Sequence, residues 1–219
     1  MAAPERWPHE VPPSGTAAWY VRGAPLTHGR WRVRCHVHDR HTDGEVIAEP
    51  GTLDDTFLLW DADVDSDGRP VLTVNPAVTP TAPPVWFVHL DERHTDPPAT
   101  LLVAFATDHL PPGTVVTDPM FFHMPVRSDD QVGAIRWWHG EAVVDQLFVQ
   151  HDMRRRHMGT VLVYAASAFH QFNGWNGRLH SDGRRTTLGE ALVTGLRHPE
   201  RIAKLEKLMP PMDPDAVQP

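Results

Sequence analysis

Short apolar stretches, the first of them with alternating apolar and polar residues, recur through the first 130 residues, a pattern typical of strands. The first such stretch is 29–40, where Trp31, Val33, Cys35 and Val37 lie on one side. Residues 55–64 and 70–74 flank an Asp-Ser-Asp-Gly turn, which predicts a hairpin. Residues 85–90 and 100–106 predict two more strands.

After residue 132 the pattern changes. Residues 134–138 and 142–149 predict two strands joined by a turn. The first sustained helical period then follows, because apolar residues recur every three or four positions from Met158 to Phe169. A short strand is predicted at 178–180.

Two further helices are predicted near the end of the chain. Thr187 and Glu190 have the spacing of a capping box, which marks a helix start. Beyond Pro199, the residues Ile202, Leu205 and Leu208 would share one side of a final helix.

This order of elements indicates an α+β fold with a mixed, mostly antiparallel sheet flanked by helices and a β-rich N-terminal half. Residues 1–25 are rich in proline and small residues, so we expect an extended arm there. Residues 26–130 would supply the β-rich half of the sheet and the acceptor region. Residues 131–210 would form the core, and 211–219 a C-terminal tail.

Charge and composition narrow the classes of partner. The net charge is -8 and the pI is near 6.0, which disfavours nucleic acid or an anionic membrane as the main partner. No apolar run approaches the ~20 residues that span a bilayer. The single cysteine, Cys35, cannot form an internal disulfide. A cytoplasmic protein is therefore expected.

The segment from Leu147 to Leu162 combines the features that carry chemistry. A predicted strand ends at Leu147-Phe148-Val149, a loop containing Arg154-Arg155-Arg156 follows, and a helix then begins. The first amides of a helix have no intrahelical partner and carry partial positive charge. Together with the arginines, they suit a diphosphate group.

This segment resembles the acyl-coenzyme-A-binding strand–loop–helix of the GNAT superfamily of N-acyltransferases, whose signature is R/Q-x-x-G-x-G/A. Arg154 to Gly159 occupy that register, with His157 in place of the first glycine. The phrase from His180 to Gly189 is also similar to the ending of short GNAT-like proteins of actinobacteria and their phages.

The resemblance implies a GNAT-like fold and transfer of an acyl group, with acetyl-CoA or another acyl-CoA as co-substrate, to a primary amine of a small molecule or peptide. The strand at Leu147, Phe148 and Val149 would pair with the pantetheine arm. The loop amides would hold the pyrophosphate, which gives the candidate cofactor-binding residues Arg154, Arg155, Arg156, His157, Met158, Gly159 and Thr160. A homodimer is an open alternative to a monomer.

Amine acylation needs an uncharged amine, so a base is expected near the thioester. Glu141 and Asp145 lie on or beside the strand that would face the substrate, and they are the candidate catalytic residues. His123, His139 and His180 are further candidates. A tyrosine near the end of the chain often acts as the acid in the superfamily. This chain has only two tyrosines, Tyr20 and Tyr164, and neither occupies that position.

Two other functions stay open. A GNAT-shaped binding or scaffold protein without catalysis would be consistent with His157 and the missing tyrosine. A metal-dependent hydrolase could use the His36-Val37-His38 pair, which would lie on one face of a strand. We favour the interpretation that His36 and His38 are polar residues on an exposed strand face, and we predict no metal site. Asp63 to Gly68 imitates a calcium loop, but position twelve is Val74, so a turn is expected.

Overall fold

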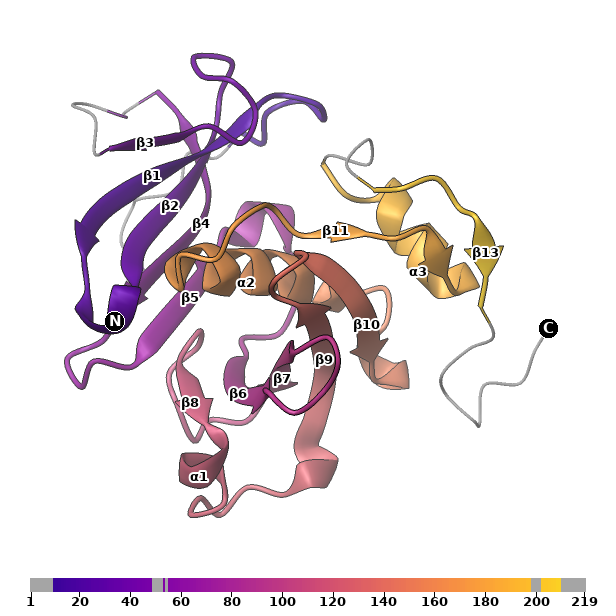
Figure 1. Cartoon of the computed structure of the whole chain (residues 1–219). Coiled ribbons are helices and arrows are strands. Elements are labelled where there is room, and N and C mark those ends of the chain that lie inside the picture. Colours follow the sequence, from indigo (N-terminus) through magenta and orange to yellow (C-terminus); the bar gives the residue numbers. More distant parts are fainter. Residues whose placement is uncertain (1–9, 49–52, 54, 198–201, 210–219) are drawn as a thin grey trace.

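Two sheets lie on either side of one long helix in the computed structural model, which describes residues 10–48, 53, 55–197 and 202–209 (Figure 1). The first sheet has the strand order β3-β1-β2-β4-β5 and is antiparallel except where β1 and β3 pair. Its strands are β1 Ala18–Pro25, β2 Trp31–Val37, β3 Val46–Ala48, β4 Phe57–Val64 and β5 Pro70–Val74.

The second sheet has the order β11-β10-β9-β7-β6-β8. Its central strands are antiparallel, whereas β8 and β11 join its edges in parallel. The strands are β6 Trp86–Glu92, β7 Ala99–Phe105, β8 Val115–Thr117, β9 Gln131–Trp138, β10 Val143–Val149 and β11 His180–Ser181. A separate small pair consists of β12 Arg184–Arg185 and β13 Lys207–Leu208.

Helix α2, Met158–Phe172, is the centre of the molecule. It contacts β2, β4 and β5 of the first sheet as well as β7, β9 and β10 of the second. All but three of its residues are buried, including the whole stretch Ala168–Phe172. A helix this buried needs small residues where the sheets approach, and Ala165, Ala166 and Ala168 have no exposed surface.

The other helices are short and lie outside this sandwich. Helix α1, Asp118–Phe121, covers part of the outer face of the second sheet, where Phe121 packs against Trp86 and Phe105. Helix α3, Thr187–Thr194, follows β12 (Figure 1). Short 3-10 turns occur at Thr27–Gly29, Pro76–Val78, Ser128–Asp130 and His151–Met153. Among the described residues, no helix combines the length and apolarity needed to cross a membrane.

The two sheets meet along one seam, between β5 and the chain entering β8. The Leu72 amide donates to the Gly113 carbonyl at 2.9 Å, and Val71 forms an isolated antiparallel bridge with Thr114. Gly113 has a φ of 83°, and a Cβ on it would lie 2.4 Å from the Leu72 carbonyl oxygen. Only glycine fits this close crossing of two backbones.

The sheet-rich architecture with mostly antiparallel strands and packed helices is confirmed. The hairpin of β4 and β5, the strands β2, β6, β7, β9 and β10, and the helix from Met158 all lie where the pattern predicts them. Of the strands before residue 130, only β6, β7 and β8 join the sheet that contains β10, and β1 to β5 form a sheet of their own.

Three expectations need correction. Residues 18–25 of the expected arm form β1, a strand with neighbours on both sides, because Ala18 to Val21 are apolar enough to be buried; residues 1–9 lie outside the described part of the chain. The final helix is wrong over residues 202–209, where Lys207 and Leu208 form β13 instead. The cap of α3 is Thr186 rather than Thr187, since its side chain accepts from the Gly189 amide at 3.1 Å. The tail 211–219 lies outside the described residues.

Enlarging an α2 alanine should test the sandwich. We expect Ala165→Leu to destabilise the protein by about 1–3 kcal/mol, because the added carbons have no room between the sheets. Ala191→Leu, on the exposed side of α3, is the matched control and should change the free energy of unfolding by less than about 0.5 kcal/mol. Urea denaturation measures both, and equal effects would contradict the packing described here.

Buried histidines should make the protein sensitive to mild acid. Burial, with a smaller contribution from Arg34, lowers the pKa of His36 to about 4. Burial also lowers the pKa of His89 to about 4, against the opposing charge of Asp91. In the unfolded chain these groups have a pKa near 6.5 and bind protons that the folded protein does not. The free energy of unfolding should therefore fall as the pH drops from about 6.5 to about 4.

Denaturation curves across that range measure the effect. In a His36→Asn, His89→Gln double variant we expect a flatter dependence above pH 4.5. Asp65 and Asp182, whose pKa values are lowered by hydrogen bonds from Arg69 and Arg184 despite burial, titrate below this window. An unchanged slope in the variant would rule the two histidines out as the cause.

Candidate functional site

The segment singled out by the sequence forms a strand–loop–helix–strand crossover. β10 runs antiparallel to β9, the chain crosses through α2, and β11 returns parallel to β10. The pairing with β11 is short, since only Val143↔His180 and Val144↔Ser181 are in register. We call the point after Val144 and Ser181, where β11 leaves β10, the fork.

Beyond the fork, β10 is an edge strand. Residues from Gln146 to Val149 pair with β9 on one side, and no described strand pairs with their other side. The backbone along that edge is therefore available to an extended ligand, except for the Val149 carbonyl, which accepts from Arg154 Nε. The side chains of Leu147 and Val149 pack toward α2, whereas Phe148 points to the opposite face and is 37% exposed.

A β-bulge lies at the fork. Trp137 pairs with Val144 and Arg136 with Gln146, so Asp145 is the extra residue on β10. Its carboxylate forms an ion pair with Arg136, which also donates to Glu92 at 2.8 Å. Burial tends to lower the pKa of Arg136, but these two carboxylates raise it overall. Asp145 is therefore held in a charged network rather than standing alone.

Glu141 occupies a different place from Asp145. It lies in the exposed turn between β9 and β10, next to Ala142, which is buried and has a φ of 58°. The basic loop begins at the other end of β10. The structure therefore brings Asp145 to the fork, whereas Glu141 lies in the turn just before the paired residues Val143 and Val144, at the end of β10 away from the basic loop.

The basic loop has an unusual backbone. Arg154 is extended, Arg155 is left-handed with a φ of 57°, and His157, the cap of α2, is left-handed with a φ of 58° and a ψ of 12°. This is a conformation that glycine adopts readily and that other residues seldom adopt. His157 thus reproduces the backbone geometry that a glycine at its position would favour.

The side chains of the loop divide into anchors and exposed groups. Arg154 is half-buried and donates from Nε to the Val149 carbonyl at 3.3 Å. Arg155 and Arg156 are exposed, and Arg156 contacts the Met153 sulfur. The His157 ring is fixed by a 2.8 Å hydrogen bond between its Nδ1 and the Thr81 hydroxyl. Two guanidinium groups are therefore directed to solvent beside the start of α2.

At the first turn of α2, only the backbone is available to a ligand. Met158 and Thr160 have buried side chains, and Gly159 lies against α3, where an added Cβ would come within 3.1 Å of Leu192. The amides of these three residues are the first of the helix and have no intrahelical acceptor.

The phrase from Ser181 to Glu190 has a structural role. The Arg185 side chain is only 8% exposed and donates to the Ser181 hydroxyl, the Glu190 carboxylate and the Ala203 carbonyl. These bonds fix the segment after β11 to α3. The sequence phrase from Ser181 to Glu190 therefore stabilises the fold next to the fork.

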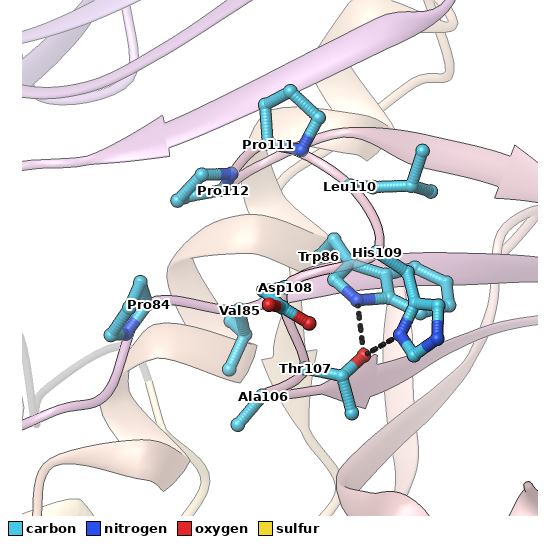
Figure 2. Close-up of a pocket in the computed structure, with 10 residues that line it drawn as sticks. All are labelled: Pro84, Val85, Trp86, Ala106, Thr107, Asp108, His109, Leu110, Pro111 and Pro112. Atoms are coloured by element: carbon cyan, nitrogen blue, oxygen red, sulfur yellow. Dashed lines mark hydrogen bonds between the residues drawn. The ribbon is translucent and has the colours of Figure 1, made fainter. Parts of the chain in front are cut away.

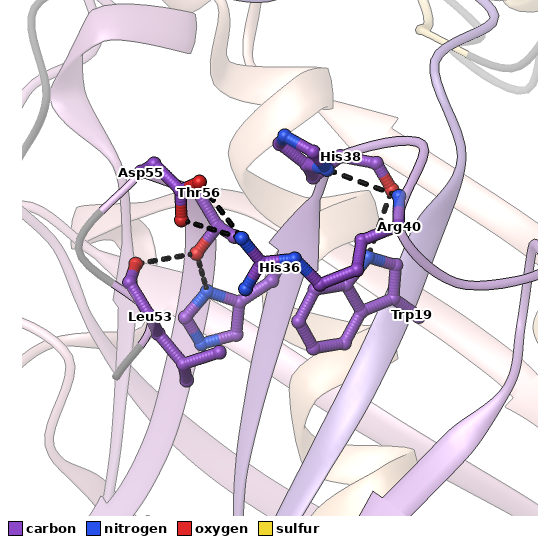
Figure 3. A network of polar contacts seen from close by, with 7 residues as sticks. All are labelled: Trp19, His36, His38, Arg40, Leu53, Asp55 and Thr56. Atoms are coloured by element: carbon purple, nitrogen blue, oxygen red, sulfur yellow. Dashed lines mark hydrogen bonds and ion pairs between the residues drawn. The ribbon is translucent and has the colours of Figure 1, made fainter. Parts of the chain in front are cut away.

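His36, in β2, and His38, just after it, belong to no group of three or more potential metal ligands among the described residues, and other partners hold both rings (Figure 3). His36 is buried, stacks on Trp19 and exchanges a 2.8 Å hydrogen bond with Thr56. His38 accepts from the Arg40 amide, and Arg40 pairs with Asp55. The calcium-like segment is a turn, since Asp65 accepts from the amides of Asp67 and Arg69.

Two open depressions lie away from the crossover. One, of about 440 Å³, is bordered by Trp86, Pro111 and Pro112, and its polar rim is a chain from Trp86 Nε1 through the Thr107 hydroxyl to His109 (Figure 2). The other, of about 420 Å³, lies between the segment 10–16 and the ends of β2 and β4. Neither is lined by β10, the basic loop or α2.

Two sets of residues near the fork were not predicted from the sequence as part of the site. Arg136 lies inside an apolar strand run, which is a detectable signal for a paired buried charge. Trp137, His170 and Trp175 come from three separate segments, and no local pattern predicts that they meet.

No protein-family model, no curated protein and no solved structure matches this chain.

The left-handed cap can be tested by a pair of substitutions. His157→Gly and His157→Ala both lose the bond to Thr81, but only glycine adopts the observed φ without strain. We expect the glycine variant to be more stable than the alanine variant by about 1 kcal/mol. Thermal or urea unfolding measures the difference, and a more stable alanine variant would show that residue 157 is not left-handed.

Proposed function

We propose that the chain is an acyl-CoA-dependent N-acyltransferase that transfers an acyl group, acetyl in the simplest case, to a primary amine of a small molecule or peptide. One observation carries this proposal. A left-handed basic loop begins the buried helix α2, directly beyond a strand with a free edge that leads to a fork.

The loop offers what a pyrophosphate requires. The first amides of α2 have no acceptor within the helix, and the exposed guanidinium groups of Arg155 and Arg156 flank them. The resemblance of Arg154 to Gly159 to the GNAT signature assigns the same place to the phosphates. His157 retains the glycine-like backbone, which supports a functional loop despite the departure from the signature.

The free edge of β10 would hold the rest of the coenzyme. The pantetheine arm is extended and contains amides, so it can pair with residues 146–149 as an added strand would. Its thioester end would then reach the fork, close to Asp145 and Arg136. Asp145 is already ion-paired with Arg136, so its simpler role is to fix the backbone of β10 at the bulge. If Asp145 is the base, it would have to take the proton while still paired with Arg136.

A binding protein without catalysis is the second candidate. Tyr20 lies in the first sheet against Trp60, and Tyr164 lies on α2 near Arg197, so neither is placed at the fork as an acid. Such a protein would bind acyl-CoA without turnover.

Calorimetric titration with acetyl-CoA tests the proposal. We expect micromolar binding by the wild type and at least about tenfold weaker binding by an Arg155→Ala, Arg156→Ala variant, because each charge-assisted bond to phosphate contributes about 1.5–3 kcal/mol before solvent screening. An Arg93→Ala, Arg127→Ala variant removes two equally exposed charges elsewhere and should bind as the wild type does.

A screen of primary amines with acetyl-CoA then separates the two candidates. Release of free thiol supports the transferase, whereas binding without release supports the non-catalytic protein. A wild type that does not bind acetyl-CoA would reject both.

A further inference from the structure

Three buried nitrogens near the C-terminal half of α2 have no hydrogen-bond partner among the described residues: His170 Nδ1 on the helix, and Trp137 Nε1 and His89 Nε2, whose rings both contact Phe169. Trp137 Nε1 and His170 Nδ1 have no hydrogen-bond partner among the described residues, although both residues are completely buried. An unpaired buried donor or acceptor destabilises the folded protein, and such groups nearly always have a partner, protein or water.

The two rings belong to one cluster, which we call the Trp175 cluster and define as Trp137, Phe169, His170 and Trp175. The ring centre of Trp175 lies 6.4 Å from that of Trp137, 5.5 Å from that of His170 and 6.1 Å from that of Phe169. Trp175 is half-buried and covers the cluster from the loop between α2 and β11. His139 stacks on its outer side at 4.7 Å.

The hydrogen-bonding character of the cluster is fixed. His170 Nε2 lies 2.9 Å from the Asn176 carbonyl, which can only accept, so Nε2 carries the proton and Nδ1 is an acceptor. Trp137 Nε1 is a donor. One donor and one acceptor match a small neutral molecule such as water, whereas an ammonium group lacks an acceptor and a carboxylate lacks a donor. Burial lowers the pKa of His170, which keeps its acceptor uncharged at neutral pH.

The cluster also lies beneath the fork. Trp137 is the cross-strand partner of Val144, the last residue of β10 that pairs with β11. The loop that contains Trp175 leads directly into β11, whose first amide, of His180, donates to the Ala142 carbonyl. Trp137 is therefore adjacent to the place where the thioester would lie, and Trp175, which contacts both Trp137 and His170, connects His170 to that place.

We propose that one water molecule is bound between Trp137 Nε1 and His170 Nδ1, and that through this water His170 accepts the proton of the acceptor amine. The second half rests on the proposed function. The amine nitrogen attacks the thioester carbon, its proton passes to the water, and a proton of the water passes to Nδ1. The carbon–sulfur bond then breaks, and the imidazolium returns its proton through the water to the leaving thiolate.

This assignment gives both proton transfers to one group. It requires neither Glu141, which is exposed in the turn before β10, nor the ion-paired Asp145 to act as a free base. It also supplies the acid for which no tyrosine is available. His170 is oriented by the Asn176 carbonyl, an arrangement that fixes the tautomer of histidine bases.

Matched variants test the proton route. His170→Gln keeps a donor for the Asn176 carbonyl and an acceptor for the water but removes the basic nitrogen that takes up the proton, and we expect kcat to fall about 100-fold with an unchanged affinity for acetyl-CoA. Trp137→Phe removes only the donor and should also lower kcat. The control is His109→Gln. His109 is exposed and follows the C-terminal end of β7, away from the Trp175 cluster, so this variant should retain wild-type kcat. Wild-type turnover by the His170 variant would overturn the route.

A crystal structure of the wild type decides the water site independently. We expect one ordered water within about 3.2 Å of both Trp137 Nε1 and His170 Nδ1. Density that contacts only one of the two atoms, or none, would overturn the site. If the wild type does not bind acetyl-CoA by calorimetry, the proposed function and the proton route fail together, while the crystal structure still decides the water.

Discussion

The burial of α2 between two sheets is the constraint on which the rest of the structure depends. Because of this position, the two ends of α2 lie in different environments. At its start, His157 and the basic loop reach solvent beside the edge of β10. At its end, Phe169 and His170 are enclosed with Trp137 and Trp175. The helix therefore fixes the distance between the exposed basic loop and the buried Trp175 cluster, and the fork lies near the cluster end of the helix.

Electrostatics differ sharply between these two regions. Around Asp145, two carboxylates share the single guanidinium of Arg136 in a half-buried network. Around Trp175, the same strand β9 contributes only a neutral donor, and burial keeps His170 uncharged. A bulge of one residue in β10 separates the two, since it shifts Asp145 out of register with its neighbours. Charge is thus confined to the bulge and excluded from the side of the sheet that faces α2.

Much of this arrangement was predictable from the sequence, and the exceptions have physical reasons. Alternating residues identified most strands, and the helical period identified α2, because both patterns reflect local burial. The same patterns carry no information about which strands pair, so the division into two sheets was not predictable. Leu205 and Leu208 have helical spacing but are 42% and 58% exposed, so burial does not enforce a helix there. The basic loop was readable as a run of charge, whereas the ion pair of Asp145 depends on a register shift that no local pattern encodes.

The sandwich around α2 also has a consequence for synthesis of the chain. Strands β1 to β5 leave the ribosome first, and the inner face of their sheet, with Val33, Leu59 and Leu72, is built to pack on α2. Residues 75–157 must be made before that helix exists, which takes several seconds at ordinary translation rates. During that interval the nascent first sheet has no native cover for its apolar side. The newly made chain should therefore be a client for chaperones that shield hydrophobic surfaces until α2 arrives.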